Sequence, residues 1–108
     1  MNDRALNMLG LCARARRVIT GEKAVVQAIR AGACRVAILD GGVAKNGEKA
    51  VTQACQTHGT ALLITAPGAL GRAIGMPGRM AAAVTDAGMA ERILQLCDLP
   101  EGASPSES

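Results

Sequence analysis

Hydrophobic positions along this chain change repeatedly between helical and strand spacing. Within residues 3–14 they recur at the i, i+3, i+4 and i+7 positions of one helix face, which predicts a helix capped by Asn2 or Asp3. Residues 18–20 are β-branched and predict a short strand, and residues 22–31 return to helical spacing. The pattern therefore begins with a helix, a strand and a second helix.

The rest of the chain continues this alternation. Glycine readily adopts the left-handed backbone of a helix C-terminus, so Gly32, Gly59 and Gly75 are expected to end three of the helices. The expected elements after residue 31 are a buried strand at 35–40, a helix at 45–58, a buried strand at 61–65, a helix at 67–74 with Pro67 in its first turn, a strand at 80–86 and a last helix capped by Thr85 or Asp86. The strand at 80–86 is the weakest, because alanine has a low strand propensity.

Alternation of this kind predicts an α/β protein, a three-layer α/β/α sandwich around a four-stranded mixed sheet. Strands that are apolar on both faces suit a sheet covered by helices on both sides. The length of 108 residues suits one domain, expected over residues 1–99. Residues 100–108 contain no core-forming side chain and are expected to be a disordered acidic tail.

The composition narrows the chemistry. The chain has no aromatic residue, which excludes RNA-binding modules that stack bases on Phe or Tyr. Its formal net charge is +3, but seven of its nine arginines fall within residues 14–35 and 72–79. Clustered arginine favours an anionic partner such as RNA, and the alternative is a solvated basic face.

No catalytic, metal or membrane signal is evident. His58 is expected at a helix C-terminus, while Asp40 is explained by a turn and Asp86 by a helix cap. No apolar run approaches the ~20 residues of a membrane span. We expect a cytoplasmic protein without catalytic residues, metal, cofactor, small-molecule substrate or membrane partner. The cysteines lack CxxC spacing and are expected to be buried, reduced thiols: Cys12, Cys34, Cys55 and Cys97.

Two segments are candidates for anion binding. In "RARRVITGEKAV", three arginines precede a strand that leads through Gly21 into a helix, whose first amides lack partners and favour an anion. Lys23 stands in the first helical turn, against the helix dipole, which suggests a partner that supplies negative charge. In "IGMPGRM", Met76 and Arg79 combine apolar and basic atoms in one loop, a combination that suits an unstacked base and a phosphate. The alternatives are an exposed loop in the first segment and a core position for Met76.

Several collinear segments resemble the L-seven-Ae/L-thirty-e ribosomal protein superfamily. They are "ITGEKAVVQAIRAG", "RVAILD" and "LGRAIGMPGRMAAAVTD", and the bacterial YlxQ-type members are similar through "LGLCARARRVITGE" and "AVTDAGMAERI". The resemblance spans residues 4–97 and implies a single-domain α/β/α sandwich that binds kink-turn RNA.

The resemblance also implies contact positions. The family's GxNExxK-like motif begins at Gly21, but Lys23 replaces its asparagine, Ala24 its glutamate and Gln27 its lysine, so two residues that read base edges are absent. The family's second contact loop follows an LGxAxG helix, which residues 70–75 match.

The sequence therefore predicts a non-enzymatic RNA-binding protein that recognises structured RNA, including kink-turn RNA, in association with ribosomal RNA and translation. The alternatives are a protein-interaction module that docks on the translation machinery without RNA contact, and an enzyme on a doubly wound sheet. The candidate RNA-binding residues are Arg14, Arg16, Arg17, Gly21, Glu22, Lys23, Gln27, Met76, Pro77, Gly78 and Arg79.

Overall fold

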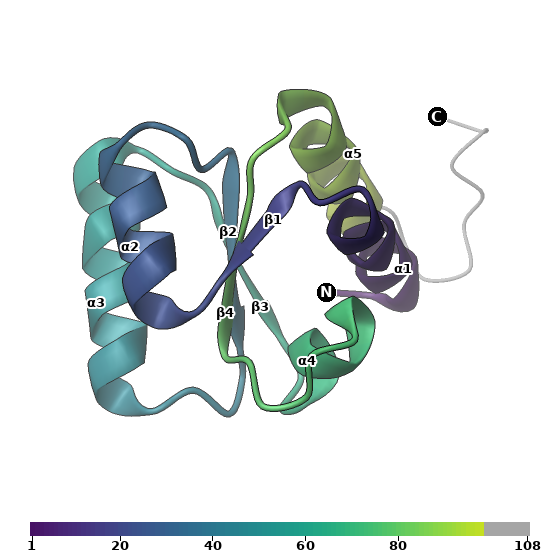
Figure 1. Ribbon diagram of the computed structural model, residues 1–108, viewed down its shortest axis with the longest axis horizontal. Coiled ribbons are helices and arrows are strands. Elements are labelled where there is room, and N and C mark those ends of the chain that lie inside the picture. Colours follow the sequence, from purple (N-terminus) through teal and green to yellow (C-terminus); the bar gives the residue numbers. More distant parts are fainter. Residues whose placement is uncertain (99–108) are drawn as a thin grey trace.

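The computed structural model describes residues 1–98 as a four-stranded sheet with helices on both faces (Figure 1). The elements are α1 Asp3–Arg14, β1 Val18–Thr20, α2 Glu22–Arg30, β2 Val36–Asp40, α3 Lys45–His58, β3 Leu62–Thr65, α4 Ala69–Ile74, β4 Ala81–Val84 and α5 Ala87–Asp98. The predicted three-layer α/β/α sandwich is confirmed. The predicted disordered tail at 100–108 lies outside the described residues.

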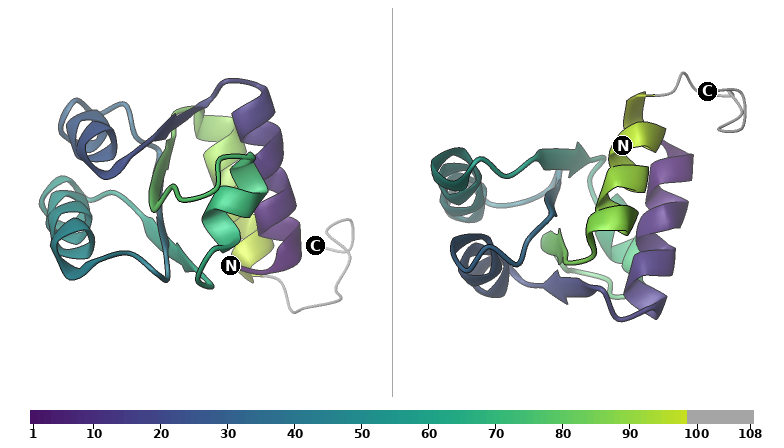
Figure 2. Two further views of the ribbon diagram at one scale, coloured as in Figure 1. Left: turned by 60° about the horizontal axis from the view of Figure 1, so that its bottom comes forward. Right: turned by 90° about the horizontal axis from the view of Figure 1, so that it is seen from above.

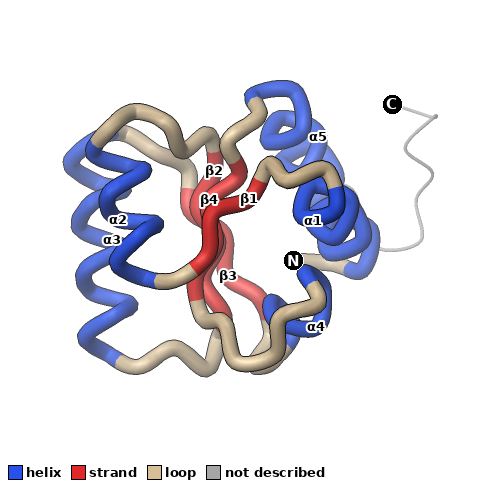
Figure 3. Tube along the Cα trace, in the orientation of Figure 1, coloured by secondary structure: helices blue, strands red, loops and turns tan. Residues whose placement is uncertain are grey.

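The sheet is mixed, with the strand order β1-β4-β2-β3 (Figure 3). β2 and β3 are parallel, whereas β4 runs antiparallel to both β1 and β2. Thr20 at the end of β1 pairs with Ala82 near the start of β4, and Val18 pairs with Val84. The turn that leaves β1 therefore lies beside the loop that enters β4.

Each face of the sheet has its own core. Alternate residues of β2 point to opposite faces, so Val36 and Ile38 pack with α1, α4 and α5, whereas Ala37 and Leu39 pack with α2 and α3. The alanine-rich strand β4 is fully buried in the middle of the sheet. Hydrogen bonding to strands on both sides outweighs its low strand propensity.

The helix ends follow the predicted signals, with one difference at α4. The caps are Asn2, whose Oδ1 accepts from the amide of Ala5 at 2.9 Å, and Asp86, whose Oδ1 accepts from Met89 at 2.9 Å. α4 begins at Ala69 after Gly68, which has φ +81°, so Pro67 precedes the helix instead of standing in its first turn. The other predicted boundaries differ by no more than two residues. No helix within residues 1–98 has the length and apolarity to span a membrane.

Burial makes the cysteines poor nucleophiles. Cys12, Cys34 and Cys55 are buried and Cys97 is half-buried, and all four are free thiols. Burial, and to a smaller extent the neighbouring Cys55, raises the pKa of Cys34 to about 11. Burial likewise raises the pKa of Cys12 and Cys55. Because the thiolate is the reactive form, these side chains are inert near neutral pH.

We expect iodoacetamide near neutral pH to leave Cys12, Cys34 and Cys55 unmodified in the native protein. After unfolding in guanidinium chloride, all of them should react, because exposure restores the ordinary thiol pKa. Mass spectrometry of the intact and digested protein measures both states. Rapid alkylation of Cys34 in the native protein would contradict its burial.

Candidate functional site

The turn after β1 and the loop before β4 meet at one end of the sheet. The amide of Gly21 donates to the carbonyl of Ala81 at 3.0 Å, and Thr20 Oγ1 lies 4.0 Å from Met76 Sδ. A Cβ atom placed on Gly21 would lie 3.7 Å from Arg79 Nη1, so this backbone and the guanidinium group are neighbours. We call this surface the rim; it consists of Thr20, Gly21, Lys23, Met76, Pro77, Gly78 and Arg79.

The N-terminus of α2 is open at the rim. Gly21 is the N-cap residue, has φ +99° and supplies no side chain to cap the helix. The first amide to bond within the helix region is that of Val25, which donates to the carbonyl of Gly21 at 2.9 Å. The amides of the first turn therefore face outward at the positive end of the helix dipole, and Lys23 is exposed beside them.

A tight turn shapes the second half of the rim. The amide of Arg79 donates to the carbonyl of Met76 at 3.2 Å, and Pro77 and Gly78 occupy the two central positions. Gly78 has φ +90°, the backbone that a type II turn requires after proline. The turn lies directly on Gly71 of α4, where an added Cβ atom would come within 2.8 Å of the carbonyl oxygen of Met76.

Met76 points outward instead of filling the core. Its side chain is 47% exposed, whereas Leu70 of α4, six residues earlier, is fully buried. The alternative interpretation, in which Met76 fills the core, is therefore wrong. The rim presents an apolar side chain next to two cationic ones, Lys23 and Arg79.

The structure separates the upstream arginines from the rim. We call Arg14, Arg16 and Arg17 the arginine cluster. The carbonyl of Arg17 accepts from the amide of Thr85 at 2.9 Å, which places the cluster at the other end of β1 and β4. At about 3.3 Å per residue, Arg17 and Gly21 stand about 13 Å apart along the strand. The sequence placed these arginines in one candidate segment with Gly21 and Lys23, but the structure puts them on two separate surfaces, because strand β1 lies between them.

Asp40 holds the turn after β2 and the start of α4 from inside the molecule. Its carboxylate is fully buried and accepts from the amides of Gly42 and Gly68, each at 2.9 Å, from the amide of Leu70 at 3.1 Å and from Thr65 Oγ1 at 3.2 Å. Burial alone would raise the pKa of Asp40, but these hydrogen bonds outweigh it and hold the pKa below its ordinary value. The predicted turn role is confirmed by the bond to Gly42, but the contacts to the start of α4 were not predicted.

The available groups do not suggest metal chemistry. Within residues 1–98, no group of three His, Cys, Asp or Glu side chains is placed to hold a metal ion. The oxygens of Asp40 already accept four hydrogen bonds, so this carboxylate has a structural role.

Comparisons with known proteins place the chain in a family. No family model matches it. The RNA-binding protein YlxQ of Bacillus subtilis (strain 168) is 35% identical over 92 residues, which cover 84% of this chain and 92% of that protein. The chain belongs to the YlxQ family. The resemblance of the sequence to YlxQ-type proteins is thereby confirmed.

Solved structures agree with this assignment. A protein with unknown function from Bacillus halodurans C has a TM-score of 0.85 and 32% identity, and the match covers 91% of this chain and 100% of that chain. The 15.5kD RNA binding protein of Giardia lamblia has a TM-score of 0.70 and covers 87% of this chain and 88% of that one. At 19% identity, the second likeness concerns the fold alone.

Two candidate residues of this YlxQ-family chain lie away from the rim turn. An added Cβ atom on Gly47 would fall 2.5 Å from Glu22 Cδ, so the Glu22 carboxyl group packs against the first turn of α3. There it lies near the positive end of the α3 dipole and joins α2 to α3. Gln27 is exposed one turn after Lys23, and both line a shallow groove between these two helices.

Proposed function

We propose that this chain is a non-enzymatic RNA-binding protein that holds structured RNA at the rim. The observation that carries the proposal is the meeting of the uncapped start of α2 with the exposed turn containing Met76 and Arg79. Outward-facing amides, Lys23 and Arg79 suit phosphate oxygens, because each supplies hydrogen-bond donors at a positive potential. Met76 and Pro77 offer an apolar surface for a base or sugar in a chain without aromatic residues.

The chemistry of the rim favours backbone contacts over base reading. Lys23 and Ala24 stand where the resembled family has an asparagine and a glutamate that read base edges. Neither residue has the side-chain oxygen with which an amide or a carboxylate accepts hydrogen bonds from a base. We therefore propose recognition of RNA shape, with kink-turn RNA and ribosomal RNA as ligands and a place in translation. The YlxQ protein and the Giardia protein are both named as RNA-binding, which supports the general class.

Crosslinking in cells followed by sequencing of the attached RNA tests this function. We expect enrichment of folded RNA with sharply bent internal loops, ribosomal RNA included, and crosslinked peptides that contain residues 20–24 or 76–79. Recovery of no RNA above background would contradict the proposal. Partner association that survives nuclease and varies little with salt would instead support a protein-interaction module, because phosphate contacts weaken steeply as salt rises.

A further inference from the structure

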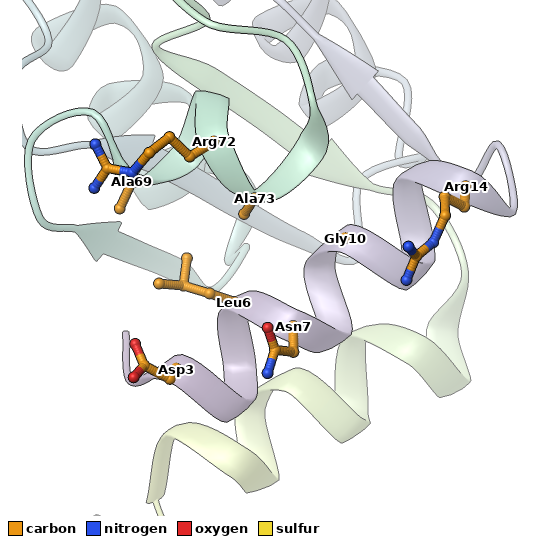
Figure 4. Close-up of a pocket in the computed structure, with 8 residues that line it drawn as sticks. All are labelled: Asp3, Leu6, Asn7, Gly10, Arg14, Ala69, Arg72 and Ala73. Carbon is orange, nitrogen blue, oxygen red and sulfur yellow. The ribbon is translucent and has the colours of Figure 1, made fainter.

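An open groove of about 490 Å³ runs between α1 and α4 (Figure 4). The helices approach closely because Gly10 has no side chain: an added Cβ atom there would lie 2.8 Å from the carbonyl oxygen of Ala73. Ala69 and Ala73 also line the groove. These small residues leave the longer polar side chains of the two helices exposed above a shallow floor.

Two arginines supply the positive charge of this groove. Arg14 comes from the last turn of α1 and Arg72 from α4, and both are exposed. The Arg72 guanidinium rests on Gly68, where an added Cβ atom would lie 2.9 Å from Nη1. Asp3 also lines the groove, and Figure 4 shows it toward the end where Arg72 lies, remote from Arg14. At 1.5 Å per residue, Asp3 and Arg14 are about 16 Å apart along α1.

The groove adjoins both surfaces that β1 separates. α4 leads directly into the rim, and the amide of Met76 donates to the carbonyl of Gly71 at 2.9 Å, next to Arg72. Arg14 belongs to the arginine cluster at the other end of β1. The left view of Figure 2 shows α1 and α4 beside each other on one face of the sheet, with β1 running away from the end of α1.

We propose that the α1–α4 groove carries RNA backbone that continues from the rim toward the arginine cluster, with Arg72 as a phosphate-binding residue. This inference rests on the proposed function and extends it. The charge pattern and the continuity with the rim favour a polyanion. A docked peptide would need a larger apolar anchor site than Leu6 and the two alanines of this lining offer. The ligand class is therefore folded RNA with a helical segment that extends past the nucleotides at Met76.

Arg72→Gln tests the groove, because it removes one guanidinium outside the rim and the arginine cluster. The probes are two RNA hairpins with the same kink-turn internal loop, one with a long flanking helix and one with that helix cut to a few base pairs. Lys49→Gln is the matched control, since Lys49 is an exposed cation on α3, across the sheet from the groove.

On the long RNA, Arg72→Gln is expected to lower affinity about fivefold and the salt slope by about one unit. Arg72→Gln should bind the short RNA with the affinity of the native protein. Lys49→Gln should bind both the long and the short RNA with that native affinity. The groove does not carry RNA if Arg72→Gln and Lys49→Gln bind the long RNA with the same affinity. The same conclusion follows if Arg72→Gln lowers the affinity for the long and the short RNA equally.

A second pair of variants adds charge instead of removing it. Asn7→Glu puts a carboxylate into the groove, and Gln53→Glu puts one on the exposed surface of α3. We expect only Asn7→Glu to weaken the long RNA, with circular dichroism and thermal melting unchanged in both. Equal binding by the two variants would contradict the groove. If the native protein binds both RNAs but neither Arg72→Gln nor Asn7→Glu weakens binding of the long one, only this inference is overturned. If the native protein binds neither RNA, the proposed function is overturned.

Discussion

Replacing Lys23 and Arg79 together by alanine is expected to lower RNA affinity about fiftyfold near 0.1 M salt and to reduce the salt slope by about two units, because each contact with a phosphate releases about one counterion. Both side chains are exposed, so the free energy of unfolding should change little. Fluorescence anisotropy with a labelled kink-turn RNA, repeated over a range of salt concentrations, measures affinity and slope together.

The double variant Lys45→Ala and Lys49→Ala is the matched control. It removes the same charge from exposed positions of α3, so the general electrostatic attraction falls equally while the rim stays intact. If the two double variants lose affinity equally, the rim has no special role and only net charge matters. Native affinity and slope in the Lys23 and Arg79 variant would contradict the rim as an RNA contact.

Asp40→Ala is expected to lower the free energy of unfolding by about 3 kcal/mol, because it leaves buried amide donors without an acceptor. Asp40→Asn should cost nearly as much. Each carboxylate oxygen accepts at least one backbone amide, from Gly68 on one and from Leu70 on the other, so an amide NH₂ must face a donor in either orientation. Chemical denaturation measures both changes. Asp98→Ala, an exposed carboxylate at the end of α5, should change stability by only about 0.5 kcal/mol.

The same residue predicts an acid transition. The folded pKa of Asp40 lies below its ordinary value of 3.8, so its contribution to stability is present above that value and disappears as pH falls through the folded pKa. Urea midpoints measured from about pH 6 down to about pH 2 should fall for the native protein and fall less for Asp40→Asn, which has no carboxylate to protonate at this position. Parallel decreases in the two proteins would show that other groups control acid unfolding.

Most of the local structure could be predicted because its causes are local. Helical spacing and the turn residues around each element located all nine elements, and each bound that they predicted lies within two residues of the observed one. Burial of Cys12, Cys34 and Cys55 followed from their small apolar neighbours, whereas Cys97 was also expected to be buried and is only half-buried. Gly32, Gly59 and Gly75 each adopt the positive φ expected at a helix end, a preference that belongs to glycine itself.

The arrangement of the site depends on contacts that no local pattern contains. The antiparallel pairing of β1 with β4 joins residues more than 60 positions apart, and this pairing places Gly21 beside the turn at Met76 and the arginine cluster at the far end of the strand. Asp40 reaches the amides of Gly68 and Leu70, 28 and 30 residues away. The sequence by itself determined the elements, their ends and the chemical character of the exposed loops, because these follow from each residue and its near neighbours. Only the tertiary structure decided which loops share a surface, because strand order and register depend on burying both faces of the whole sheet at once.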